Sequence, residues 1–500
     1  MKKNMIMSIA VLFSLLIYGL PIEAADRQIE DEIIYKVMID RYNNGDFSID
    51  EGVDVDDPQA YHGGDIEGIK KRLNEKADLG VTTIALSPIM ANSENGFHGY
   101  WVEDFTEMEE QFGTIEDLDE LVAEAHKLGM KVVIEFVTNY VSRDHEIALE
   151  PEFADWILTD EVNGPDWTEN VVQLNQDNPE VQKFLIDAAS FWLKETNVDG
   201  LVLHAVDQSS VDFLSNITSE LKNSYPDHYL IGDVLNPESD VSEIMENTEL
   251  DAVDNYALSR GIAEVFSEVD QSPEEILELH KEYAEAGSIL FVDDFYSERF
   301  TQKFSENGRN SVTTWTLALT YMYTTPGTPM IIQGSEVSMY GETAEDSQRL
   351  VPHHSGEPEL KEFHDRISSL HDEFPALRHG DFELVDSRDS FAVFKRTYED
   401  ETLYVAINNG SESSYIDITD VDSDKMLRGY LGDNIARENE EGNHRIGIPR
   451  ESVEVYEVVD YEGFNWLLIS LVGGVMIVFV TGIIYLTLKQ KRREASEQTK

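Results

Sequence analysis

Cysteine is absent from this chain of 500 residues, and basic residues are scarce. Without cysteine, neither a disulfide nor a thiolate metal site can form. The 37 Lys and Arg residues are outnumbered by 99 Asp and Glu residues, so the formal net charge is −62 at pH 7. A chain of this charge repels phosphate backbones, which excludes nucleic acid as a partner. The acids are spread along the chain, and this predicts a solvated acidic shell suited to a saline or alkaline exterior.

Near each end of the chain lies a long apolar run without charge. Residues 1–25 begin with two lysines, continue with an apolar run and end with small residues, a pattern typical of a secretory signal peptide. The alternative, an uncleaved anchor, is less favoured because the run is short and ends at Pro21. Residues 464–488 carry no charge and exceed the ~20 apolar residues that a membrane-spanning helix needs.

The segment that follows the second apolar run sets the predicted orientation. Residues 489–500 begin with KQKRR, and a basic cluster marks the cytoplasmic side of a membrane. A buried core helix is the alternative, but the run shows no amphipathic face. The sequence therefore predicts a single-pass protein of the cell membrane, anchored in the lipid bilayer by the C-terminal helix. Its ectodomain would be extracellular and its tail cytoplasmic.

Between the two ends, short apolar runs alternate with segments of helical spacing. TTIALS and KVVIEFV are rich in β-branched residues, as buried parallel strands are. Residues 115–128 lie between them and have apolar residues at helical spacing, with Thr114 as the predicted N-cap and Gly129 as the stop. Such alternation fits a closed (β/α)₈ barrel over residues 26–375, although an open doubly wound sheet fits almost as well. Residues 376–460 show period-two alternation, which predicts a small antiparallel β domain.

Several segments resemble, in order, the alpha-amylase family of glycoside hydrolases (glycoside hydrolase family 13). They are IIYKVMIDRYNNGD, YHGGDIEGI, FHGYWVEDF, QFGTIEDLDELVAEAHKLGMKVVIEFV, LNQDNPEVQKFLIDAASFWLKETNVDG, PGTPMIIQGSE and LRHGDFELV. The resemblance covers nearly the whole predicted ectodomain. It implies a catalytic TIM barrel with a short insert after the third strand, at about 142–173, and a C-terminal β domain. It also implies a role in carbohydrate metabolism, with α-glucan or maltooligosaccharide as the ligand.

The three catalytic positions of the family pattern are altered here. Members use an aspartate nucleophile, a glutamate acid/base and a second aspartate, because a retaining mechanism needs one carboxylate to attack and another to protonate. His204 stands at the nucleophile position, Asp233 at that of the acid/base, and Tyr296 at that of the second aspartate. A neutral imidazole has no charge to stabilise an oxocarbenium-like centre, and an aspartate is one methylene too short for the acid. Glu135 and Tyr140 replace two further pocket residues, while Asn139 is retained.

Other features of the family pattern are kept. His98, Tyr100 and Trp101 match an aromatic segment beside the sugar that is cleaved, and aromatic faces bind sugar rings by apolar contact. Ordinary core packing is the alternative for these residues. A loop matching the calcium site of bacterial members supplies Asn44, Asp46, Asp50, Gly63 and Asp65, and calcium prefers such oxygen ligands. An acidic turn in an acidic protein is the alternative there.

The sequence therefore predicts a membrane-anchored alpha-amylase-like protein without catalysis, a pseudoenzyme that binds glucan or has a structural role. Two alternatives stay open. One is a working α-1,4-glucan hydrolase or transglycosylase with atypical catalytic residues. The other is an ectodomain that binds proteins and has no role with carbohydrate.

Overall fold

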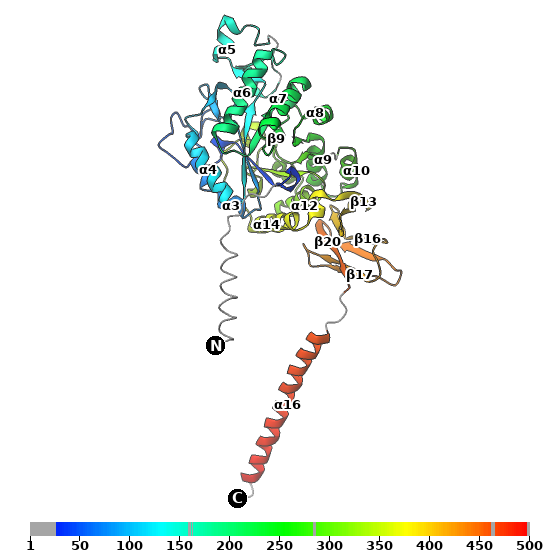
Figure 1. The fold of residues 1–500 in the computed structure, drawn as a ribbon. Coiled ribbons are helices and arrows are strands. Elements are labelled where there is room, and N and C mark those ends of the chain that lie inside the picture. The colour runs from blue at the N-terminus through cyan, green and yellow to red at the C-terminus, as the bar shows by residue number, and fades with distance from the viewer. Residues whose placement is uncertain (1–26, 159–161, 163, 284–286, 462–465, 498–500) are drawn as a thin grey trace, which may run out of the picture.

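A computed structural model of the chain describes residues 27–158, 162, 164–283, 287–461 and 466–497 (Figure 1). The predicted signal peptide, residues 1–25, lies outside the described residues. So do residues 464 and 465 at the start of the predicted membrane span.

Eight parallel strands close into a barrel in the order β1-β12-β11-β10-β9-β8-β5-β2. The first strand, β1, pairs with both β2 and β12, so the predicted (β/α)₈ barrel is confirmed and the open sheet is excluded. The barrel strands are β1 (Ile34–Val37), β2 (Thr83–Leu86), β5 (Lys131–Val137), β8 (Gly200–His204), β9 (Tyr229–Gly232), β10 (Ala252–Asp254), β11 (Ser288–Leu290) and β12 (Thr328–Ile332).

Helices surround the barrel (Figure 1). They are α2 (Ile66–Lys70), α3 (Leu73–Ala77), α4 (Ile115–Lys127), α5 (Glu146–Leu149), α6 (Pro179–Glu195), α7 (Val211–Ser224), α8 (Ser242–Asn247), α9 (Tyr256–Ser267), α10 (Glu274–Tyr283), α11 (Phe300–Glu306), α12 (Ser311–Thr324), α13 (Ala344–Ser347), α14 (Pro358–Glu373) and α15 (Pro375–His379). Short 3₁₀ helices lie among them: η1 (Ile29–Asp31), η2 (Ile39–Arg41), η3 (Pro151–Phe153), η4 (Asp166–Asn170), η5 (Val206–Gln208) and η6 (Ser335–Val337).

Helix α4 illustrates how the local sequence sets these elements. Thr114 caps it as predicted, since the Thr114 hydroxyl accepts a hydrogen bond from the backbone N–H of Asp117 and the Asp117 carboxylate accepts one from the N–H of Thr114. Such a reciprocal capping box satisfies two backbone donors that the helix leaves free. The apolar residues at helical spacing in α4 are all buried, so this face packs against the barrel.

Two hairpins extend from the carboxyl ends of the barrel strands. Strand β3 (Met90–Asn92) pairs with β4 (Val102–Met108), and β6 (Tyr140–Ser142) pairs with β7 (Val171–Gln173). The second hairpin frames the insert that follows the third barrel strand, β5, as the family pattern implies. The hairpins and the insert border the mouth of the barrel, where active sites of this fold lie.

After α15 the chain forms a second unit of antiparallel strands, shown in yellow and orange in Figure 1. Its six-stranded sheet has the order β13-β14-β15-β20-β17-β18, and β16 pairs with β19 beside it. The strands are β13 (Asp381–Arg388), β14 (Phe391–Tyr398), β15 (Glu401–Asn408), β16 (Ser414–Ile418), β17 (Lys425–Gly429), β18 (Ile435–Ala436), β19 (His444–Ile448) and β20 (Ser452–Asp460). Helix α12 contacts β15 and β20 and so joins this unit to the barrel.

The last helix, α16 (Trp466–Glu497), extends away from both units in Figure 1. Its segment Ser470–Lys489 is long and apolar enough to cross a membrane, with a mean hydropathy of 2.4, and none of it is buried. The core helix of a soluble protein can be equally long and apolar, but it would be mostly buried. The segment Ser470–Lys489 is not buried and so differs from such a core helix.

Candidate functional site

The interior of the barrel is built in layers, because every second residue of a strand points inward. Along the middle of the strands these residues are apolar and form a core cluster of their own: Ile34, Ala85, Val133, Val202, Ile231, Ala252 and Ile289 are members. Two residues further along the strands, the same face carries charged side chains instead. We call this set the ion layer: Lys36, Glu135, His204, Asp233 and Asp254, all buried.

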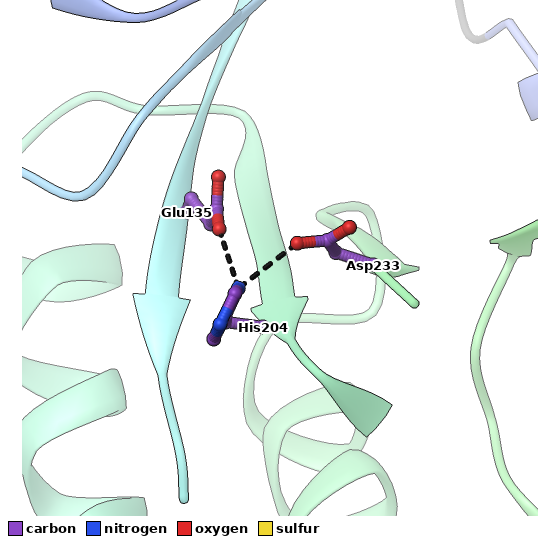
Figure 2. A group of neighbouring side chains, drawn as sticks. All are labelled: Glu135, His204 and Asp233. Atoms are coloured by element: carbon purple, nitrogen blue, oxygen red, sulfur yellow. Dashed lines mark hydrogen bonds and ion pairs between the residues drawn. The ribbon is translucent and has the colours of Figure 1, made fainter. Parts of the chain in front are cut away.

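His204 is the centre of the ion layer (Figure 2). Its Nδ1 lies 2.7 Å from Oε1 of Glu135 and 2.9 Å from Oδ2 of Asp233. His204 is the last residue of β8. Glu135 belongs to β5, and Asp233 is the residue that follows β9. The imidazole is 0% exposed, so it contacts no solvent. His204 is therefore a buried histidine that is held in place by hydrogen bonds to two carboxylates.

Lys36 is the second cation of the ion layer. Its Nζ lies 3.5 Å from Oδ1 of Asp233 and 3.9 Å from Oε2 of Glu135. Each of these two carboxylates is therefore shared between an ammonium and an imidazole. Buried charges persist only when paired in this way.

The pKa values follow from this pairing. Burial lowers the pKa of His204, but its hydrogen bonds with Asp233 and Glu135 outweigh burial and raise the pKa to about 9. Burial also works against the charge on Asp233, yet Lys36 and His204 hold its pKa well below the ordinary value. Burial raises the pKa of Asp254, which hydrogen-bonds to Asp233. At neutral pH the layer thus holds an imidazolium rather than a neutral imidazole.

Glu135, His204 and Asp233 also form the one group of metal-type ligands found among the described residues. A metal ligand must offer a free lone pair, and histidine ligates as the neutral imidazole. Here Nδ1 of His204 hydrogen-bonds to both carboxylates, and the Lys36 ammonium lies beside them. The donor set fits an ion-pair cluster better than a metal centre.

A cluster of aromatic rings covers His204. The ring centroids of Tyr100, Trp167 and His204 form a triangle with sides of 4.4, 4.6 and 5.7 Å. The hydroxyl of Tyr296 donates to that of Tyr100 over 2.6 Å. Tyr100 is only 1% exposed, so its ring has no free face toward solvent.

Above this cluster lies a cavity of about 930 Å³, which we call the outer cleft. Its rings are Phe97, His98, Trp101, Trp167, Tyr256 and Tyr296; its side-chain amides are Gln59, Asn170, Gln208, Asn236 and Gln348; its acids are Asp166, Asp294 and Glu345. No Lys or Arg is among the described residues that line it, and neither are Glu135, His204, Asp233 or Tyr100.

The predicted sugar-binding residues are divided by this arrangement. His98 and Trp101 line the outer cleft, and Nε1 of Trp101 donates to the backbone oxygen of Trp167. Tyr100 does not line the cleft, because its ring is packed against His204 and Trp167. The packing of Tyr100 is thus the core packing that was the alternative for these residues, and its contact with sugar stays a prediction.

The remaining catalytic position, Tyr296, lines the outer cleft with its neighbour Asp294. The Asp294 carboxylate accepts a hydrogen bond from the backbone N–H of Tyr296 over 2.7 Å. Burial raises the pKa of Asp294. Asp294 is thus a carboxyl group at the cleft whose pKa burial raises above its ordinary value.

The five predicted calcium ligands lie in one loop region, with most of their oxygens in hydrogen bonds. The amide of Asn44 donates to both oxygens of Asp50, and Asp65 accepts from the backbone N–H groups of Gly45, Asp46 and Gly68. Gly63 has φ +84°, and a Cβ there would lie 2.5 Å from the Asn44 amide. Oδ1 of Asn44 is buried without a hydrogen bond to any described residue. An unpaired oxygen is a ligand that a hard cation can take, while Nδ2 of the same amide faces the Asp50 carboxylate.

Sequence reasoning missed Lys36, Asp254 and Trp167. A signal existed for Lys36, since a lysine inside the apolar strand IIYKV is a charge that needs a buried partner. Asp254 likewise ends a short apolar strand. Nothing in the sequence near Trp167 indicated that its ring would lie against Tyr100.

Comparison with known proteins agrees with this architecture. The family model "Alpha amylase, catalytic domain" matches residues 36–157 and 165–371, and "Alpha-amylase C-terminal domain" matches residues 380–456. The chain therefore belongs to the alpha-amylase family, whose members act on carbohydrate.

Named relatives and solved structures of the family are enzymes. A cyclomaltodextrinase of Thermoanaerobacter pseudethanolicus is 25% identical over 78% of this chain and 72% of its own. The intracellular maltogenic amylase of Bacillus subtilis (strain 168) is 24% identical over 80% and 72%. Among solved structures, an Anoxybacillus alpha-amylase is 36% identical with a TM-score of 0.83, covering 88% of this chain and 100% of that one. The Geobacillus thermoleovorans alpha-amylase complexed with acarbose is 34% identical, with a TM-score of 0.80, over 87% and 100%.

Proposed function

We propose that this protein binds α-glucan at the cell surface without cleaving it. One observation carries the proposal: the groups at the nucleophile and acid positions, His204 and Asp233, do not line the outer cleft. They are paired with Glu135 and Lys36 beneath the ring of Tyr100. A retaining glycosidase needs two carboxyl groups about 5–5.5 Å apart that both touch the sugar. A carboxylate committed to a buried cation and separated from the ligand cannot serve as either.

A working hydrolase or transglycosylase is the second candidate, and the names of the relatives favour it over the first. Cyclomaltodextrinase, maltogenic amylase and alpha-amylase are all names of enzymes. Within this chain, the observation that favours turnover is Asp294, a cleft carboxyl whose pKa is raised by burial, as a general acid requires. In that case Asp294 would be the acid, with Asp166 or Glu345 of the cleft as a second group.

Purified full-length protein assayed on soluble starch and maltooligosaccharides decides between the two. We expect no reducing sugar above a heat-inactivated control. If sugar is released and Asp294→Asn abolishes the release, the protein is a working hydrolase or transglycosylase and our proposal is wrong. Titration calorimetry with maltoheptaose then tests glucan binding itself. The absence of both turnover and binding would favour an ectodomain that binds proteins.

We also propose that α16 anchors the protein in the membrane with the folded units outside. The support is the apolar, unburied segment Ser470–Lys489 and the basic residues that follow it in the sequence. Protease added to intact cells should remove the barrel and leave only the C-terminal tail protected. Recovery of intact full-length protein in the soluble fraction of lysed cells would contradict this placement.

Calcium at the loop of Asn44 and Asp50 is a further part of the proposal. The unpaired Oδ1 of Asn44 and the adjacent Asp50 carboxylate support it, with Asp46, Asp65 and the Gly63 carbonyl as further oxygens. A bound calcium ion would cross-link this loop and stabilise the fold by mass action. Chelation should lower the thermal unfolding temperature of the wild type, and Asp50→Asn should remove that sensitivity.

A further inference from the structure

The outer cleft ends above the ion layer, and this limits where a ligand can lie. Tyr100 lies beneath the residues that line the cleft, with its ring against His204 and its hydroxyl bonded to Tyr296, which is one of those lining residues. A sugar ring that entered the space over His204 would have to displace Tyr100, which is 1% exposed. Moving Tyr100 would also expose a layer of paired charges that now has no solvent contact at His204.

The lining of the outer cleft specifies the chemical class of the ligand. Five side-chain amides line it, and amides can donate to and accept from the hydroxyl groups of a sugar. Partly exposed rings such as Trp101 and Tyr256 supply apolar faces for the C–H surface of a pyranose. Among the described residues that line it, none has a cationic side chain and three are acids, so an anionic sugar would be repelled. At about 930 Å³ the cleft is near the upper end of the ~300–1,000 Å³ that is usual for small-molecule sites.

We infer that the outer cleft binds a neutral oligosaccharide along its ring-and-amide lining, while the position over His204 stays closed to sugar by Tyr100. The inference rests on the proposed glucan binding and states which part of the site does it. Affinity then comes from an undistorted stretch of glucan. An active site differs, because it binds mimics of the distorted, charged transition state far more tightly than it binds substrates.

Acarbose and maltotetraose, which are of equal length, separate the two modes of binding. Acarbose carries an amine at the linkage that an active enzyme would cleave, and exposed catalytic carboxylates attract it. Here the carboxylates below Tyr100 are already paired with Lys36 and His204. The affinities of the two ligands should therefore agree within about threefold. A working site should favour the mimic by roughly a hundredfold or more.

The experiment is calorimetric titration of the full chain in lipid nanodiscs, since maltoside detergents would compete for the cleft. Trp101→Ala should weaken maltotetraose binding about tenfold, as loss of an aromatic anchor in a binding site does. Asn236→Ala, an exposed amide of the cleft, should weaken it about threefold without risk to folding. The matched controls outside the cleft, Trp156→Ala and Asn247→Ala, should bind as wild type does.

Three outcomes are informative. Equal affinities with losses confined to the cleft variants support the inference. If acarbose binds a hundredfold more tightly than maltotetraose, the inference is overturned while glucan binding stands. If neither ligand binds, the proposed function itself fails.

Discussion

The two ends of the barrel are both closed by buried charged layers, and these differ in how completely their hydrogen bonds are made. At the amino end, which we call the lower layer, Glu32 accepts from Arg27, Thr83 and Tyr229 over 2.8–3.0 Å, and Lys131 donates to Tyr229. Each of these groups has a partner. The ion layer at the carboxyl end is different, because Oε2 of Glu135 and Nε2 of His204 make no hydrogen bond to any described residue.

This difference matches the division of labour in the fold, in which the lower end contributes stability and the upper end carries chemistry. A buried polar group without a hydrogen bond costs about 1–3 kcal/mol. The unpaired atoms of Glu135 and His204 therefore make the ion layer the less completely satisfied of the two layers. The two layers should therefore respond differently to substitution and to pH.

The largest effect is expected from removing the centre of the ion layer. His204→Leu leaves Glu135 and Asp233 buried with only Lys36 to balance them, and breaking a buried ion pair costs about 3–5 kcal/mol. Urea unfolding of the full-length protein measures the loss. His354→Leu, at an exposed histidine, is the control and should change stability by less than ~0.5 kcal/mol. A His204→Leu protein as stable as wild type would show that the ion layer contributes nothing.

The second-largest effect is expected from alkaline pH, which should lower the free energy of unfolding by about 3 kcal/mol. This figure follows from the raised pKa of His204, since each pKa unit corresponds to ~1.4 kcal/mol. The pKa of His204 is about 9 in the folded protein, above the ~6.5 of an unfolded histidine. Because the pKa of His204 is higher in the folded protein, its protonation stabilises the fold. This contribution is complete below pH ~6.5 and is lost as the pH rises through about 9. Buried His98 and His364, whose pKa values burial lowers to about 3 and 4, act in the opposite sense and only below ~6.5.

Unfolding free energies between pH 6.5 and 9.5 test this, with His204→Gln as the matched variant. The wild type should lose stability across the interval, and the variant should show a flatter curve. Curves of equal slope would contradict an imidazolium at His204.

A smaller loss is expected at the lower layer from Glu32→Gln, which keeps the shape and one acceptor. It weakens the bonds from Arg27 and Tyr229 and removes the negative charge that faces Arg27 and Lys131. Because Arg27 is partly exposed and Lys131 keeps its hydrogen bond to Tyr229, a loss of about 1–3 kcal/mol is expected. Glu30→Gln on the same segment is the control, because no hydrogen bond from its side chain is part of the layer. A cost above that of His204→Leu would reverse the proposed ranking of the two ends.

The smallest effect is expected from restoring the family's catalytic residues. The triple variant His204→Asp, Asp233→Glu and Tyr296→Asp should still release no sugar from starch, because Tyr100 still covers the site and Lys36 pairs with the restored acids. A sensitive reducing-sugar assay measures it, with the wild type as baseline. Turnover by the triple variant would mean that the rest of the pocket is intact and that three side chains alone prevent catalysis.

Much of the fold could be predicted because it depends on local patterns. Thr114, the buried spacing of α4 and the β-branched runs define helix and strand directly, and the barrel was confirmed once resemblance had chosen between closed and open sheets. The altered catalytic positions were visible as well. Their partners were not, since the pairing of Lys36 with Asp233 joins residues almost two hundred positions apart. Likewise, the packing of Tyr100 against Trp167 could not be predicted, because Trp167 belongs to the insert and has no local signal.

The short connection between β20 and α16 has a mechanical consequence. Strand β20 ends at Asp460 and α16 begins at Trp466, and a chain spans at most ~3.3–3.6 Å per residue. Once α16 lies in a bilayer, the β domain is held within about two nanometres of the lipid surface. Any polymer that the barrel binds would then be held close to the membrane, and the barrel could not reach ligands far from the lipid surface.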